Sequence, residues 1–184
     1  MAQTNRVLRS KLFRNETAAP SAARRLDAVE MLKNEHQRIE KLFRRFAQAR
    51  GNDARAIVGE KLCEALTLHM RIEEEIFYPA FLEATSDVEM HHESEVEHNG
   101  VKVLIAQIQQ STPNDSHYSA KLKVLATMVR HHVEQEEKRD GMFAEARSAG
   151  MDLLALGEQL KARRDQMKKR MLPARVRTPF VLKQ

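Results

Sequence analysis

Two histidine–glutamate pairs share one spacing: Glu73 follows His69 by four residues, and Glu136 follows His132 by four. On a helix, side chains four residues apart lie on one face, with Cβ atoms about 5–6 Å apart. Such a pair can offer an imidazole to one metal ion and a carboxylate that bridges to a second. Imidazole-rich sites suit iron, manganese or zinc, whereas calcium and magnesium prefer oxygen ligands. The pairs therefore predict a site for two such cations.

A further histidine precedes each pair, and this makes the sequence repetitive. The two additional histidines are 62 residues apart and both follow a glutamate, while the two histidine–glutamate pairs are 63 residues apart. Each half is expected to form a helical hairpin that supplies two histidines and one glutamate. Two such halves facing each other would place six ligands around one centre. The predicted metal ligands are His36, His69, Glu73, His98, His132 and Glu136.

The structural alternative is that these residues are ordinary members of a helical core. A single histidine in an apolar stripe is more often a hydrogen-bonded core residue than a ligand. Unpaired glutamates that face a core, however, cost on the order of several kcal/mol, which metal coordination would offset. Four histidines on four helices, two of them with matched glutamates, therefore favour a metal site.

The remaining histidines are expected to lie outside this site. His131 belongs to a more polar stripe than its neighbour, and His92 and His117 are predicted at the surface. His91 precedes the third-helix ligand by one heptad, about 10.5 Å along a helix, which is too far to share its metal. A solvated helix start is the favoured interpretation of His91, and a supporting position behind the ligands is the alternative.

Two further carboxylates leave alternatives open. Glu40 lies four residues after His36 and could support the site, but a salt bridge to Arg44 is an equally good interpretation. Glu137 is a substitute for Glu136 that faces a different direction by helix geometry.

Long helices must position these residues. Only six glycines and five prolines occur in 184 residues, which argues against a barrel or sandwich. Apolar residues recur at alternating spacings of three and four, as in helical bundles. Pro79 is expected to end or kink the second helix. The sequence predicts an all-α fold, an up-and-down antiparallel four-helix bundle with an additional C-terminal helix, over residues 26–49, 53–83, 88–110, 118–147 and 151–171.

The net charge of +5 conceals an uneven distribution. Residues 1–25 hold six bases and one acid, residues 161–184 hold nine bases and one acid, and residues 26–160 are acidic. We expect a basic N-terminal extension over 1–25, the bundle over 26–150, and a C-terminal helix with a basic tail over 151–184. Basic tails contact polyanions weakly. Sequence-specific nucleic-acid binding is not expected, because no groove-reading motif or aromatic interleaving accompanies the charge.

The sequence also bears on the compartment. No apolar run is long enough to form a transmembrane segment, no secretion signal opens the chain, and Cys63 is the single cysteine. We expect a cytoplasmic protein in which Cys63 is a small apolar filler. The Arg-rich first 25 residues could alternatively be an organelle transit peptide, although a disordered tail is the preferred interpretation.

The ligand segments together resemble the hemerythrin-like HHE cation-binding family over about residues 26–160. The segments that carry the resemblance are 27–36 (DAVEMLKNEH), 69–79 (HMRIEEEIFYP), 97–98 (EH) and 131–137 (HHVEQEE). The resemblance implies an up-and-down four-helix bundle around an oxo- or hydroxo-bridged di-iron centre. By position the six predicted residues would be its ligands, with the two glutamates bridging. Manganese or zinc are possible substitutes for the two iron ions.

The chain departs from the oxygen-carrying hemerythrins at two positions. Those proteins have a second histidine four residues after the third-helix ligand, where this chain has Lys102. Their final carboxylate is an aspartate five residues after the last histidine, where this chain has Glu137 behind the better-placed Glu136. Oxygen storage is therefore disfavoured, and redox sensing or peroxide chemistry is favoured.

Three functions of different class follow. The leading hypothesis is a non-haem di-iron protein that binds small ligands such as O2, H2O2 or NO in oxygen, peroxide, nitric oxide or iron sensing and stress response. The alternative is a di-iron enzyme with catalase-like peroxide-decomposing or ferroxidase activity. The third is an interaction protein whose basic ends hold it to nucleic acid or an anionic membrane surface.

Overall fold

The computed structural model describes residues 25–171, and every regular element in this range is helical. The expectation of an all-α fold is confirmed. None of the described helices is long and apolar enough to cross a bilayer. The predicted N-terminal extension and the end of the C-terminal tail lie outside the described residues. In chain order the elements are α1 (Ala28–Gln48), α2 (Asn52–Ile72), the π-helical turn η1 (Glu73–Phe77), α3 (Tyr78–Thr85), α4 (Val88–Gln109), α5 (Tyr118–Glu137), α6 (Met142–Ser148) and α7 (Leu153–Met171).

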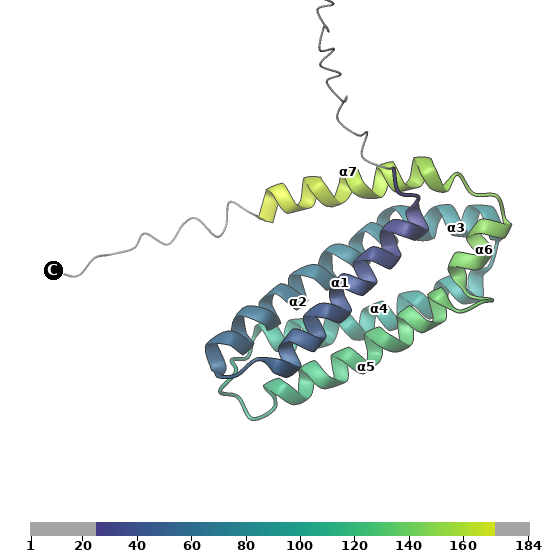
Figure 1. The fold of residues 1–184 in the computed structure, drawn as a ribbon. Coiled ribbons are helices and arrows are strands. Elements are labelled where there is room, and N and C mark those ends of the chain that lie inside the picture. Colours follow the sequence, from purple (N-terminus) through teal and green to yellow (C-terminus); the bar gives the residue numbers. More distant parts are fainter. Residues whose placement is uncertain (1–24, 172–184) are drawn as a thin grey trace, which may run out of the picture.

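Four long helices, α1, α2, α4 and α5, lie side by side, and α7 lies along the outside of α1 and α2 (Figure 1). The contacts form a ring, in which α1 packs on α2, α2 on α4, α4 on α5 and α5 on α1. A capping box begins α1: the Asp27 carboxylate accepts from the Glu30 backbone N–H, and the Glu30 carboxylate accepts from the Asp27 N–H. Its apolar face then packs inward, as the spacing predicts.

The interior contains two apolar clusters. One includes Ile39, Leu66 and Leu125 toward the α4–α5 loop, and the other includes Leu32 and Phe77 toward α3, α6 and α7. Along α1 the chain passes from the second cluster to the first between residues 32 and 39. The predicted histidine of α1 falls in this interval, so it lies where the two clusters meet.

The second predicted helix, residues 53–83, contains a π-helical turn that the sequence analysis missed. The Tyr78 N–H donates to the Glu73 carbonyl, five residues back, and the chain stays helical to Thr85. In a regular helix the ring of Pro79 would clash with the carbonyl of Glu75. The wider turn accommodates the proline. The expectation that Pro79 ends or kinks the helix is therefore corrected: the helical pitch changes in the turn before Pro79, and the helix then continues.

The fourth predicted helix, residues 118–147, is wrong as one continuous element. It ends at Glu137, because Lys138 adopts an extended backbone, and α6 begins at Met142. Gly141 lies directly over the backbone carbonyls that end α5, and a Cβ at this position would lie 2.8 Å from the backbone carbonyl oxygen of Glu136. Glycine is therefore required for the chain to fold back closely after α5.

Another close approach involves α7. A Cβ on Gly157 would contact the Leu26 carbonyl oxygen and lie 3.0 Å from the Ala28 nitrogen, both backbone atoms at the start of α1. The absence of a side chain at this position lets α7 pack directly against the capped end of α1.

This packing predicts the effect of two glycine-to-alanine changes. Alanine is normally favoured over glycine in a helix by about 1 kcal/mol. We expect Gly157→Ala to destabilise the protein nevertheless, by roughly 1–3 kcal/mol, because the backbone of α1 cannot move aside. Gly100→Ala is the control, since its new Cβ would meet only the flexible tip of Met128 at 2.6 Å. Urea unfolding should show loss of stability in the first variant and little change or a gain in the second.

Candidate metal centre

All six predicted ligand residues lie together in the interior, between the two apolar clusters. None is more than 5% exposed. Each long helix contributes one histidine, and the glutamates come from η1 and from the end of α5. The residues are His36 on α1, His69 on α2, Glu73 on η1, His98 on α4, and His132 and Glu136 on α5.

The four imidazoles form two facing pairs. The Nε2 atoms of His36 and His69 are 3.0 Å apart, and those of His98 and His132 are 3.2 Å apart. Each pair joins neighbouring helices, α1 with α2 and α4 with α5. Nitrogen atoms that converge in this way can share a cation, since two ligands at about 2.0–2.1 Å from one ion lie up to roughly 4 Å apart.

Glu73 lies between the two histidine pairs. Its Oε2 is 3.3 Å from His69 Nε2 and 3.5 Å from His98 Nε2, and its Oε1 is 3.9 Å from His36 Nε2. Of the three groups of three described residues whose ligand atoms are close enough together for one ion, two lie in this centre, and Glu73 belongs to both. These two groups are His36, His69 and Glu73, and Glu73, His98 and His132.

Glu136 also spans the two pairs. Its Oε2 is 3.3 Å from His36 Nε2, and its Oε1 is 3.6 Å from His132 Nε2. Its two oxygens therefore face histidines of different pairs, as a bridging carboxylate requires.

Three of the four oxygens of the buried carboxylates lack a hydrogen-bond donor. Within the described part of the chain, both oxygens of Glu73 and the Oε2 of Glu136 are buried with no hydrogen-bond partner. Burial, together with the negative charge of Glu136, raises the pKa of Glu73 well above its usual range. A buried carboxylate without donors is costly unless a cation compensates it. Oxygen atoms without partners beside converging imidazole nitrogens match the needs of a bound metal, so the residues fit the predicted centre.

The histidines experience opposing influences. Burial lowers the pKa of His36, but its contacts with Glu136 and Glu137 outweigh this and raise the pKa to about 9. Burial lowers the pKa of His69 well below its usual range, and the positive charge of His36 adds to this effect. Without a metal the cluster therefore holds a proton on His36, which a cation would have to displace.

Three of the four imidazoles are oriented by a carboxylate behind them. His36 Nδ1 lies 2.7 Å from Glu137 Oε1, His98 Nδ1 lies 2.9 Å from Glu74 Oε1, and His132 Nδ1 lies 2.8 Å from Glu97 Oε2. Such contacts fix the ring so that Nε2 faces the centre. Spacing along the sequence predicts Glu137 only as a substitute ligand and predicts no role for Glu74 or Glu97, because these contacts join different helices.

Lys102 occupies the position at which oxygen-carrying hemerythrins have a histidine. Its Nζ lies 2.7 Å from Glu74 Oε1, the same oxygen that contacts His98 Nδ1. The lysine therefore holds the carboxylate behind a predicted ligand and does not face the centre itself.

Tyr78 is a further residue of the site that the sequence analysis did not identify. Its hydroxyl donates to Glu136 Oε1 at 3.1 Å and lies 3.2 Å from His98 Nε2. Tyr78 is the first residue of α3, directly after the π-helical turn, and it is 1% exposed. Its register on a regular helix would differ, so the pattern of the sequence alone gave no signal for it.

The histidines predicted to lie outside the centre do so, with one difference. The side chains of His131 and His117 are 62% and 79% exposed, and His92 is also exposed. His91, for which a solvated helix start was favoured, has a side chain only 16% exposed and packs its ring edge against Tyr78. Of the two interpretations of Glu40, the salt bridge is the one observed. Glu40 pairs with Arg44 and with Arg130, and not with the centre.

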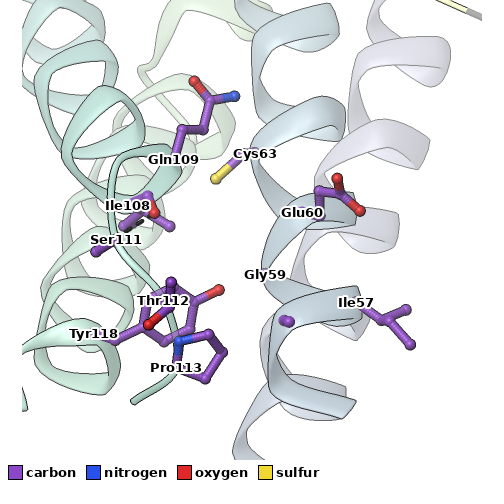
Figure 2. A pocket seen from close by; sticks show the side chains of 11 residues that line it. Ile57, Gly59, Glu60, Cys63, Ile108, Gln109, Ser111, Thr112, Pro113 and Tyr118 are labelled. Carbon is purple, nitrogen blue, oxygen red and sulfur yellow. Dashed lines mark hydrogen bonds between the residues drawn. The ribbon is translucent and has the colours of Figure 1, made fainter. Parts of the chain in front are cut away.

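Cys63 lies away from the centre, six residues before His69 on α2, or about 9 Å along the helix. It lines a pocket of about 540 Å³ between α2 and the α4–α5 loop, together with Tyr118 and Pro113. Figure 2 shows its sulfur directed toward Ile108 across this space. Burial raises the pKa of the Cys63 thiol to about 11, so the thiol is neutral and of low reactivity.

Comparison with known proteins places this geometry in context. An uncharacterised protein of Mycobacterium tuberculosis strain H37Rv, Rv2633c, is 26% identical over 146 residues, which cover 78% of this chain and 88% of the relative. An uncharacterised protein of Mycobacterium bovis, Mb2666c, matches to the same extent. A crystal structure of a hemerythrin HHE cation-binding domain-containing protein, the Rv2633c homologue of Mycobacterium kansasii, superposes with a TM-score of 0.66. It is 25% identical, and the match covers 80% of this chain and 90% of that one.

The family model of the hemerythrin HHE cation-binding domain matches residues 27–144. This range includes all six predicted ligands, the π-helical turn that begins at Glu73 and the end of α5 at Glu137. The chain therefore belongs to the hemerythrin HHE cation-binding domain family.

Proposed function

We propose that the chain is a non-haem di-iron protein whose six buried histidine and glutamate residues hold two iron ions. The observation that carries the proposal is the position of Glu73, which belongs to both groups of potential ligands. In this proposal Glu73 and Glu136 bridge the ions, each of which receives imidazoles from one half of an up-and-down four-helix bundle over residues 26–150. The C-terminal helix and tail over 151–184 are accessory to it.

The donor set is compatible with iron. Imidazole with carboxylate suits iron, manganese and zinc, and the absence of thiolates from the centre argues against a soft-metal site. Two bridged iron ions would supply redox chemistry toward small oxygen- or nitrogen-containing ligands. The protein side chains orient this centre: Glu137, Glu74 and Glu97 hold the imidazole rings, and the Tyr78 hydroxyl holds Glu136 by donating a hydrogen bond to its Oε1.

The first prediction concerns metal content. His98→Ala and Glu73→Ala should bind much less than the proposed two iron ions per chain, because each removes a ligand from the centre. His92→Ala, on the same helix as His98 but exposed, is the matched control and should keep the full content. Elemental analysis and the absorption spectrum of the oxidised protein measure this. Equal iron in all three variants and wild type would contradict the proposed ligands.

The second prediction concerns protons. His36 carries a proton near pH 7 in the metal-free site, because its pKa is raised to about 9. Binding of Mn²⁺ near pH 7 should therefore release at least one proton, and affinity should rise with pH as this proton is lost. Anaerobic calorimetry in buffers of different ionisation enthalpy counts the protons. Glu137→Gln, which removes a contact that raises this pKa, should release fewer.

A specific observation favours turnover of a small substrate as a second function. A cavity of about 30 Å³, bounded by Ser94, Gln135 and Met142, reaches Glu136. A space of this size admits a molecule as small as water or peroxide but excludes larger substrates. We propose O2, H2O2 or NO as ligands on this ground, with either sensing or peroxide decomposition in the cytoplasm as the role.

The third prediction tests this path. Ser94→Leu should fill the cavity and slow oxygen evolution from peroxide roughly tenfold, while leaving the iron content unchanged. Ser148→Leu, at an exposed position of α6, is the control and should have no effect. If the iron centre turns over peroxide, His69→Ala should abolish activity and His92→Ala should retain it. Full activity in Ser94→Leu would show that substrate reaches the centre elsewhere.

A further inference from the structure

A basic groove lies between α1, α2 and the C-terminal part of α7, separate from the metal centre. It has a volume of about 580 Å³. Five basic side chains from three helices line it, and two carboxylates, Glu35 and Glu64, also reach it. The basic residues are Arg38, Lys41, Arg45, Lys61 and Lys168. We refer to this feature as the basic groove.

Helix geometry brings these charges together. Arg38, Lys41 and Arg45 follow one another at spacings of three and four, so they lie along one face of α1. Lys61 faces them from α2 and Lys168 from α7, because these helices pack against α1 and against each other. The groove is therefore a product of tertiary packing, and the tail sequences alone did not predict it.

The two carboxylates of the groove do not balance its five basic side chains. Glu35 is already engaged, since its Oε1 lies 2.7 Å from Arg164 Nη1. The groove thus keeps a positive charge that an anion can meet.

Two nearby groups also favour an anion. Among the described residues, the buried Nε of Arg164 has no acceptor within hydrogen-bond distance: Asp165 Oδ1 lies 3.8 Å from it, and its Nη1 is paired with Glu35. Lys168 lies one helical turn further along α7 and borders the groove. Burial lowers the pKa of Lys168, and the positive charges of Arg164 and Arg38 lower it further. An anion beside these groups would supply the absent acceptor and relieve the repulsion.

We propose that the basic groove binds a ligand with two or three linked phosphate groups, either free or attached to a nucleoside. Several cations around one concave space match an anion of several charges better than a single carboxylate. Arginine guanidinium and lysine ammonium groups form strong charge-assisted hydrogen bonds with phosphate oxygens. The volume is in the range of small-molecule sites, about 300–1,000 Å³.

The test measures binding of pyrophosphate, tripolyphosphate and ATP to the full-length, metal-loaded protein by calorimetry at low ionic strength. Lys168→Glu should weaken pyrophosphate binding at least tenfold, the loss expected from removing one charge-assisted hydrogen bond. Lys169→Glu is the matched control, because it changes the net charge equally on an exposed neighbour outside the groove. Arg45→Gln provides a second groove variant. Circular dichroism and iron content, measured before and after exposure to the anion, separate binding from unfolding and chelation.

The outcomes distinguish the ligand sources. Equal affinity for tripolyphosphate and ATP would indicate free polyphosphate, and tighter ATP binding would indicate a nucleotide. Both results support the proposal if Lys168→Glu weakens the binding at least tenfold. Equal weakening by Lys168→Glu and Lys169→Glu, or no binding of pyrophosphate, would overturn it. Tight binding of duplex DNA that pyrophosphate does not displace would overturn it as well.

Discussion

The constraint on which the rest of the structure depends is the burial of two carboxylates in a helical core. Glu73 and Glu136 have almost no exposure, and three of their four oxygens lack a hydrogen-bond donor. Such groups cost free energy unless positive charge compensates them. The surrounding imidazoles supply part of this compensation, and the proposed cations supply the remainder. Folding and metal binding are therefore expected to stabilise one another.

Two departures from regular helix geometry occur beside these carboxylates. The π-helical turn starts at Glu73 and brings Tyr78 into contact with Glu136. The second departure is the end of α5 directly after Glu137, where Gly141 permits the chain to fold back and α6 to cover the centre. Phe143 on α6 then stacks on His36 at a ring separation of 5.8 Å. Irregular helical turns of this kind are frequent at functional sites, since they re-aim side chains that a regular helix would direct elsewhere.

Charge is organised in layers around the centre. Carboxylates behind the imidazoles orient the rings, and Lys102 and Lys33 in turn hold two of those carboxylates. Outside this layer, α7 adds a basic surface: Arg164 engages Glu35, the residue next to His36, and Lys168 completes the basic groove. The net charge of the whole chain obscures this arrangement, in which buried glutamates face the centre and five basic side chains line the basic groove.

The sequence by itself determined the helical class, the inward faces and the six candidate ligands, because these depend on local spacing along a helix. The histidine–glutamate spacing of four residues fixes a shared face whatever the tertiary packing. It did not determine the π-helical turn, which accommodates Pro79 by its wider pitch, or the break after Glu137, where the backbone folds back closely at Gly141, since no periodicity records either feature. Tyr78, Glu74 and Glu97 entered the site for the same reason: their contacts reach residues on other helices. Only the tertiary structure decides such contacts, because hydrogen bonding between helices depends on how the helices pack.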